Sequence, residues 1–292
     1  MKREDFIKKG LFGAAFTAAS SSALAKLLEN NNDELTPLDI IGFNHLPNTK
    51  PEIMSNTILH KADTRGHANH GWLNSHHTFS FAGYYNPDRM HFGVLRVLND
   101  DTVAAGMGFG THPHDNMEII SIPLEGDLEH KDSMGNTQII KHGNIQVMSA
   151  GTGITHSEYN KNKDSEVKFL QIWVFPNKKN VTPRYGQITL NSNDRHNKFQ
   201  QILSPNTDDE GVWIHQNAWF FLGKFDKDKQ TNYAIKQKNN GAYFFIINGE
   251  ASINGQLLNK RDGFGIWNSD KIEITSHSDN TEILVMDVPM IN

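Results

Sequence analysis

Cysteine is absent from this chain of 292 residues. That absence excludes a disulfide framework, a zinc ribbon, an iron–sulfur cluster and catalysis by a thiol. An excess of positive charge is also missing, because 28 Lys and Arg stand against 33 Asp and Glu, for a net charge of −5. Nucleic-acid binding relies on a basic footprint, so the sequence predicts no direct nucleic-acid partner.

Long hydrophobic runs are lacking too. The weakly apolar stretch 10–25 is too short, and too rich in Ala, Ser and Thr, to span a bilayer. It follows a positively charged start and ends in Ala23-Leu24-Ala25, a small-x-small pattern typical of a cleavage site. We interpret residues 1–25 as an export signal and expect a periplasmic or otherwise exported protein. The alternative is a cytoplasmic protein with an N-terminal helix.

A polar spacer, 26–57, precedes a body in which short apolar runs are broken by Gly, Asn and Asp. Asn248-Gly249, after the apolar run Tyr243–Ile247, is a strong hairpin signal. No later segment keeps a helical period over twelve residues. This pattern predicts an all-β bicupin, with two β-sandwich or jelly-roll barrels packed together. We expect the N-terminal cupin at 58–190 and the C-terminal cupin at 191–292.

Histidine is the abundant residue type, with 11 of the 15 His between His60 and His156. His112 and His114 stand at i and i+2 on an extended segment, so both point to one face. His156 and Glu158 have the same spacing. If the two segments face each other, three imidazoles and one carboxylate could bind Fe(II), Ni, Cu, Co, Mn or Zn. A barrel interior would leave coordination positions open for catalysis.

Other polar residues are weaker candidates. Glu118 shares the parity of His112 and His114, so an unbroken strand would aim it at the same metal, as a ligand or as a partner that orients an imidazole. His76 and His77 could line a pocket, or could be partly buried polar groups on a strand. His130 could face the cavity or only solvent.

From about Ile58 to Asn292 the chain resembles the pirins, a family of two-cupin proteins. The motifs that carry the resemblance are Arg65-Gly66-His67, Gly71-Trp72-Leu73, His77–Phe81 (HTFSF), Phe92–Val97 (FGVLRV), Gly108–Ile119 (GFGTHPHDNMEI), Ser149–Ile154 (SAGTGI), His156-Ser157-Glu158, Phe169–Trp173 (FLQIW) and Arg261–Trp267 (RDGFGIW). The resemblance implies one metal, usually iron, in the N-terminal cupin. Its ligands would be His112, His114, His156 and Glu158, which favours Glu158 over Glu118. The C-terminal cupin would hold no metal.

The resemblance also implies an activity. Some pirins, notably bacterial ones similar to this chain, are quercetin 2,3-dioxygenases, which open the central ring of a flavonol with O₂ and release carbon monoxide. The metal would bind the 3-oxygen, and Glu158 or a neighbour would accept the hydroxyl proton as the catalytic base. We therefore expect a phenolic substrate, O₂ and a monomeric or weakly associating chain. The alternatives are a metal-dependent sensor or interaction protein without turnover, and an enzyme that acts on another phenolic compound.

Overall fold

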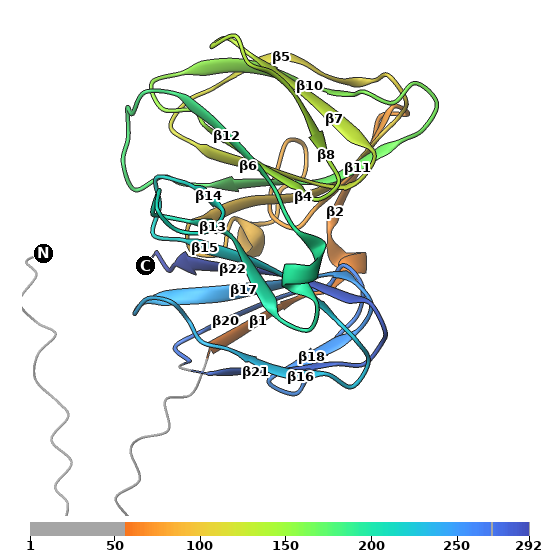
Figure 1. Ribbon diagram of the computed structural model, residues 1–292, viewed down its shortest axis with the longest axis vertical. Helices are drawn as coiled ribbons and strands as arrows, with labels where there is room; N and C mark the ends of the chain where they lie inside the picture. Colours follow the sequence, from red (N-terminus) through yellow and green to blue (C-terminus); the bar gives the residue numbers. More distant parts are fainter. Residues whose placement is uncertain (1–55, 270, 292) are drawn as a thin grey trace, which may run out of the picture. The chain divides into compact units, whose positions relative to one another are not determined.

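The computed structural model describes residues 56–269 and 271–291. The predicted export signal lies outside these residues, as does the spacer apart from its last two positions, which begin the first strand. The described part is built almost entirely of strands, joined by loops and the short 3₁₀ helices η2 (Ala62–Thr64), η3 (Pro87–Arg89) and η4 (Ser192–Arg195) (Figure 1). The prediction of an all-β protein is confirmed.

The first sandwich consists of a seven-stranded and a four-stranded sheet. In spatial order, the larger sheet contains β12 (Arg184–Thr189), β9 (Asn144–Ser149), β6 (Glu118–Glu125), β11 (Val167–Val174), β4 (Leu95–Val103), β3 (Leu73–His77) and β2 (Gly66–Asn69). The smaller sheet contains β5 (Gly108–His114), β10 (Ile154–Asn160), β7 (Asp127–Asp132) and β8 (Thr137–Lys141). The domain is thus two facing sheets rather than one closed barrel.

The second sandwich repeats this arrangement. Its larger sheet contains β1 (Asn56–His60), β20 (Gly263–Trp267), β17 (Asn240–Asn248), β22 (Thr281–Pro289), β15 (Trp219–Phe225), β13 (Phe199–Ser204) and β14 (Val212–Trp213). Its smaller sheet contains β16 (Gln230–Tyr233), β21 (Ile272–Ser276), β18 (Ala251–Ile253) and β19 (Gln256–Leu258). The change from one sandwich to the other falls between β12 and β13.

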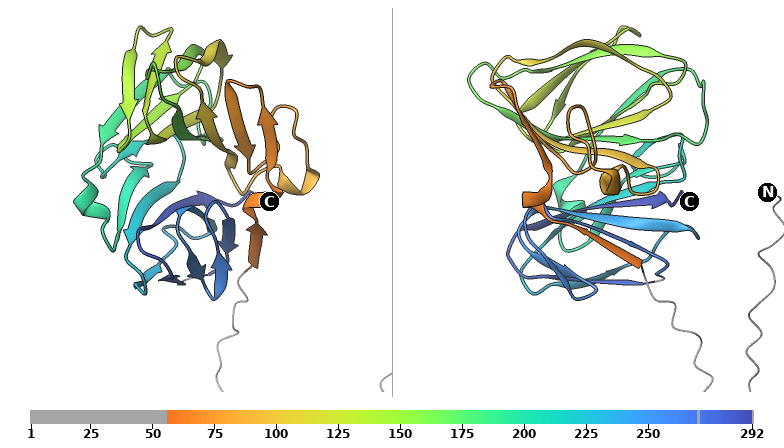
Figure 2. Two further views of the ribbon diagram at one scale, coloured as in Figure 1. Left: turned by 90° about the vertical axis from the view of Figure 1, so that its right-hand side faces the viewer. Right: turned by 180° about the vertical axis from the view of Figure 1, so that it is seen from behind.

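The first strand crosses between the sandwiches. β1 pairs antiparallel with β20, with His60 opposite Gly263, and so lies at the edge of the C-terminal sheet (Figure 2). Our sequence boundaries placed residues from 58 onward in the N-terminal cupin. The sheet pairing differs from that expectation for 58–60, because a local pattern of apolar residues does not reveal a strand's distant partner.

The two seven-stranded sheets pack against each other through one apolar cluster. Leu98, Ile120 and Leu170 contribute from the first sheet, and Phe220 and Leu284 from the second; all are almost fully buried. Hydrophobic burial on this scale is the main favourable term in folding. The smaller sheets cover the outer faces, so each sandwich encloses its own interior (Figure 1).

The two interiors differ in chemistry. A single apolar cluster that includes Phe221, Phe244 and Phe264 fills the C-terminal sandwich. The N-terminal interior contains two smaller apolar clusters, one with Phe169 and one in contact with Trp173. Gln171 lies between these two positions on β11 and faces the same way. The interior of the first sandwich therefore has a polar zone between its apolar ends.

Candidate metal centre

Three of the predicted site residues meet between the sheets of the first sandwich. His112 and His114 lie on β5, and His156 lies directly opposite His112 on β10. The ring centroids are 4.5 Å apart for His112 and His156, and 4.9 Å apart for each of the other two pairs. One nitrogen of each ring lies within 4.8 Å of the others, close enough to share one metal ion. We call these three residues the histidine cluster.

Glu158 lies two residues beyond His156 on β10. A carboxylate oxygen of Glu158 lies within 4.8 Å of a ring nitrogen of His156 and of one of His130, and all three side chains are buried. Ser121 Oγ donates to Glu158 Oε1 at 3.1 Å, and Gln171 Nε2 donates to Oε2 at 2.8 Å. These two donors come from the opposite sheet, so they hold the carboxylate in place between the sheets.

Glu118 does not join the histidine cluster. The chain turns at Asn116, whose φ of 44° is left-handed, and β6 then begins in the other sheet. The carboxylate of Glu118 accepts a hydrogen bond from Ser149 Oγ at 2.7 Å and faces Arg184. The parity argument assumed an unbroken strand, and the turn removes that condition.

Hydrogen bonds leave ring nitrogens of the cluster free to bind a metal. His112 Nδ1 lies 2.7 Å from the carbonyl oxygen of Gly110, which can only accept, so Nδ1 carries the proton and the Nε2 lone pair is free. His130 Nε2 lies 3.1 Å from Asp132 Oδ2, and His130 Nδ1 faces His156 Nδ1 at 3.5 Å. When His130 is neutral, its Nε2 donates to Asp132 and its Nδ1 can only accept, so Nδ1 of His156 carries the proton. Its buried Nε2 has no hydrogen-bond partner among the described residues.

The protonation state of the cluster also suits a metal. Burial, reinforced by neighbouring imidazoles, lowers the pKa of His114 to about 4 and that of His156 to about 3. Both rings are therefore neutral at physiological pH, the form that binds metal ions. Three imidazoles beside a carboxylate, one of them with an orphaned buried lone pair, fit a divalent transition metal.

A cavity of about 300 Å³ opens beside the cluster. His112, His114 and Glu158 line it on the side of the smaller sheet. The remaining lining residues are aromatic (Phe81, Phe109, Trp173), polar (His70, Ser75, His77, Asn99, Asp101, Gln171) or small and aliphatic (Ala68, Leu73, Ala82). Ligand pockets range upward from about 300 Å³, so the cavity admits one small molecule.

The other predicted pocket residues divide between inside and outside. His77 lines the cavity. Its neighbour His76 points to the opposite face of β3 and stacks on His67, with the ring centroids 4.7 Å apart. His130 does not line the cavity but lies behind His156, with ring centroids 5.3 Å apart.

Sequence reasoning missed Asn99, Asp101 and Gln171 on the cavity floor. Burial, partly offset by a hydrogen bond from Ser75, raises the pKa of Asp101 to about 7. Single polar residues at alternate positions of apolar strands, as in Phe169-x-Gln171-x-Trp173, were the available signal.

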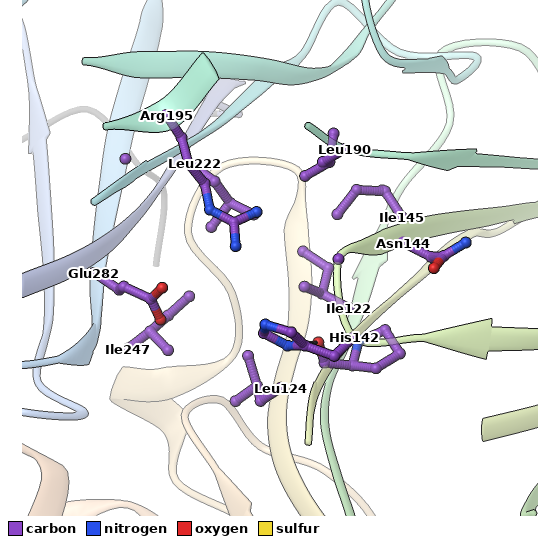
Figure 3. A pocket seen from close by; sticks show the side chains of 13 residues that line it. Ile122, Leu124, His142, Asn144, Ile145, Leu190, Arg195, Leu222, Ile247 and Glu282 are labelled. Atoms are coloured by element: carbon purple, nitrogen blue, oxygen red, sulfur yellow. Dashed lines mark hydrogen bonds between the residues drawn. The ribbon is translucent and has the colours of Figure 1, made fainter. Parts of the chain in front are cut away.

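A second hollow is much smaller. It is lined mainly by apolar side chains, including Ile122, Leu222 and Ile247, with Arg195 and Glu282 also at its wall (Figure 3). Its volume of about 30 Å³ is of the order of one water molecule. Of these two, the cavity beside the histidine cluster is the one with room for a ligand. No helix in the described part of the chain has the length and apolar character of a membrane span.

Two β-sandwiches, the first with clustered histidines between its sheets, define a two-domain cupin protein. Residues 59–174 match the family model for pirin, and residues 201–288 match the model for the quercetinase C-terminal cupin domain. The chain belongs to the pirin family.

Individual relatives agree with this assignment. The quercetin 2,3-dioxygenase of Escherichia coli K12 is 44% identical over 233 residues, which cover 80% of this chain and 99% of the relative. A pirin-like protein of Caulobacter vibrioides is 39% identical over 76% of this chain and 96% of its own length. The crystal structure of the bacterial pirin YhhW from E. coli in complex with nickel(II) has a TM-score of 0.76 at 42% identity, covering 81% of this chain and all of YhhW.

Proposed function

We propose that this protein is a metal-dependent dioxygenase that opens the central ring of a flavonol such as quercetin with O₂. The observation that carries the proposal is the pairing of the histidine cluster with a cavity of about 300 Å³ walled by Phe81, Phe109 and Trp173. Aromatic walls favour a flat aromatic ligand. The name of the E. coli relative and the nickel(II) complex of YhhW support the same reading.

His112, His114, His156 and Glu158 would hold the metal, which we propose to be Fe(II). Bound there, a divalent transition metal supplies Lewis acidity toward a phenolic oxygen and redox chemistry toward O₂. The donor set is borderline in softness and equally admits Ni, Cu, Co, Mn or Zn.

The chain's own residues bind the substrate and move its proton. Phe81 and Trp173 lie edge to face at 5.4 Å, and they would confine the ring and exclude water from it. A carboxylate oxygen of Glu158 would accept the hydroxyl proton as the catalytic base. Asp101 is the other carboxyl in the cavity, and its pKa of about 7 suits reversible proton transfer near neutral pH.

Oxygen consumption tests the proposal directly. Protein loaded with Fe(II) should take up O₂ on addition of quercetin and release carbon monoxide in equal amount. The metal-free protein and a His112→Ala variant serve as controls and should show neither. Absence of uptake and of carbon monoxide, with iron demonstrably bound, would contradict the proposal.

A second candidate function is a metal-dependent sensor or interaction module without turnover. The observation that supports this second candidate is the pirin-like protein of Caulobacter vibrioides, whose name specifies no reaction. Iron-loaded protein that turns over neither quercetin nor other phenolic compounds, yet responds structurally to metal, would favour this candidate.

A further inference from the structure

Polar side chains form a line across the larger sheet of the first sandwich. His77 is opposite Asn99, Asn99 opposite Gln171, Gln171 opposite Ser121, and Ser121 opposite Gln146. Directly opposed residues on neighbouring strands share a face. All five are more than nine-tenths buried, and the line faces the smaller sheet, which carries the histidine cluster. We call this set the polar row.

Several atoms of the polar row lack hydrogen-bond partners among the described residues. These atoms are His77 Nδ1, Asn99 Oδ1, Gln171 Oε1 and both side-chain polar atoms of Gln146. Buried polar atoms are nearly always paired with protein or ordered water, so unpaired ones on residues that line a cavity indicate a missing partner. Asn99 and Gln171 line the cavity, whereas Gln146 does not.

The unpaired buried atoms on the residues that line the cavity are mainly acceptors. Gln171 donates through Nε2 to Glu158, so its Oε1 is left as an acceptor. Asn99 also presents an oxygen, and the carboxyl of Asp101 lies on the same floor. No Lys or Arg is among the described residues that line the cavity. A neutral ligand with several O–H donors fits this surface, and a carboxylate or phosphate does not.

We propose that Asn99 and Gln171 bind hydroxyl groups of the phenolic substrate other than the one that reacts. The floor that carries them lies across the cavity from the histidine cluster, so a flat molecule that reaches both would be held at two points. This inference rests on the proposed function and deepens it, because it makes the hydroxyl groups of the rings, and not only the ring system, a requirement for tight binding.

The test compares three flavonols on the Ni(II)-loaded protein without O₂. Quercetin carries hydroxyls on both outer rings, galangin on one, and 3-hydroxyflavone on neither. Each hydrogen bond to a buried acceptor is worth up to roughly a tenfold change in affinity. By calorimetry, we expect quercetin to bind at least about tenfold more tightly than 3-hydroxyflavone. The affinity of galangin, compared with the other two, should show which outer ring carries the hydroxyl groups that are bound.

Asn99→Leu removes the acceptor at nearly constant size. It should reduce the ratio of the two dissociation constants to roughly threefold or less, with metal content unchanged. Gln146→Leu is the matched control, since Gln146 belongs to the polar row but lies outside the cavity, and it should retain the full ratio. Asn99→Ala, which also removes the acceptor, replaces Asn99→Leu if that variant does not fold.

Equal affinities for the three flavonols in the unmodified protein would overturn the inference, as would an unchanged ratio in both Asn99 variants. Turnover of quercetin without a hydroxyl preference would leave the proposed function standing and remove this inference alone. Hydroxyl-dependent binding without O₂ uptake by the iron-loaded protein would support this inference and contradict the proposed dioxygenase function. Failure of every flavonol to bind would overturn both.

Discussion

His130 and His156 face each other through their Nδ1 atoms at 3.5 Å, and Asp132 holds the far nitrogen of His130 at 3.1 Å. With His130 neutral, this chain of contacts places the proton of His156 on Nδ1. It leaves Nε2 of His156 free for a metal, although His130 itself lies behind the histidine cluster.

Loss of the Asp132 carboxylate should weaken metal binding without removing a ligand. Asp132→Asn can donate to His130 Nε2, which allows the reversed tautomer and disturbs the proton on His156. Groups that hydrogen-bond a ligating imidazole directly are worth about 10- to 100-fold in metal affinity, and Asp132 acts one residue further away, through His130. We expect a loss of up to about tenfold by competition with a chelator, and no loss in Asp127→Asn at the other end of β7. Equal affinities for the two variants would contradict the assigned role of Asp132.

Removal of a ligand should have a larger effect. His112→Ala and His156→Ala should each abolish stoichiometric metal, measured by elemental analysis, whereas the unmodified chain should bind one metal. His76→Ala is the control, because His76 stacks on His67 outside the cavity. Full metal content in either ligand variant would exclude our ligand set, and two metals per chain would reveal a site that we have missed.

Glu118 should make the metal-free protein less stable as the pH rises. Burial, partly offset by Ser149 and Arg184, raises the pKa of Glu118 from 4.5 to about 7. The unfolded chain therefore releases the proton at lower pH than the folded chain, and the free energy of unfolding falls between about pH 4.5 and 7. Above pH 7 this contribution is constant.

The variant Glu118→Gln removes that dependence. Since one pKa unit corresponds to about 1.4 kcal/mol, we expect the variant to be more stable than the unmodified protein by about 1–3 kcal/mol at pH 8. At pH 4.5 the two should differ little. Urea unfolding at both pH values measures the difference, and a stability gap that does not change with pH would refute the assigned titration.

The N-terminal segment carries a separate prediction. We propose that residues 1–25 direct export and are removed, so that the mature chain begins near Lys26. Mass spectrometry of the protein from periplasmic and cytoplasmic fractions identifies the terminus. An intact Met1 or Lys2 in every fraction would argue for the cytoplasmic alternative.

The sequence was informative where local periodicity decides the outcome. His112 and His114 share a face because β5 is regular between them, and the alternation of a strand can be read without coordinates. Glu118 was less predictable, since a single left-handed residue, Asn116, moves the chain into another sheet. The inter-sheet hydrogen bonds to Glu158 depend on how the strands pair.

The cavity floor shows the same limit. Asn99 and Gln171 lie far apart in the sequence and become neighbours only through the register of β4 and β11. Each of them alone is one polar residue in an apolar strand, which has many ordinary explanations. Register arises from the pairing of whole strands, so no local pattern could have placed these two side chains next to each other.

The pairing of β1 with β20 ties the first described strand to one of the last. During synthesis β1 leaves the ribosome before every other described strand, yet its partner is made only after the whole first sandwich and most of the second. The opening strand must therefore remain unpaired until synthesis is almost complete. A cut between the two cupins would separate β1 from its sheet and uncover the edge of β20, so the C-terminal half alone would form an incomplete sandwich.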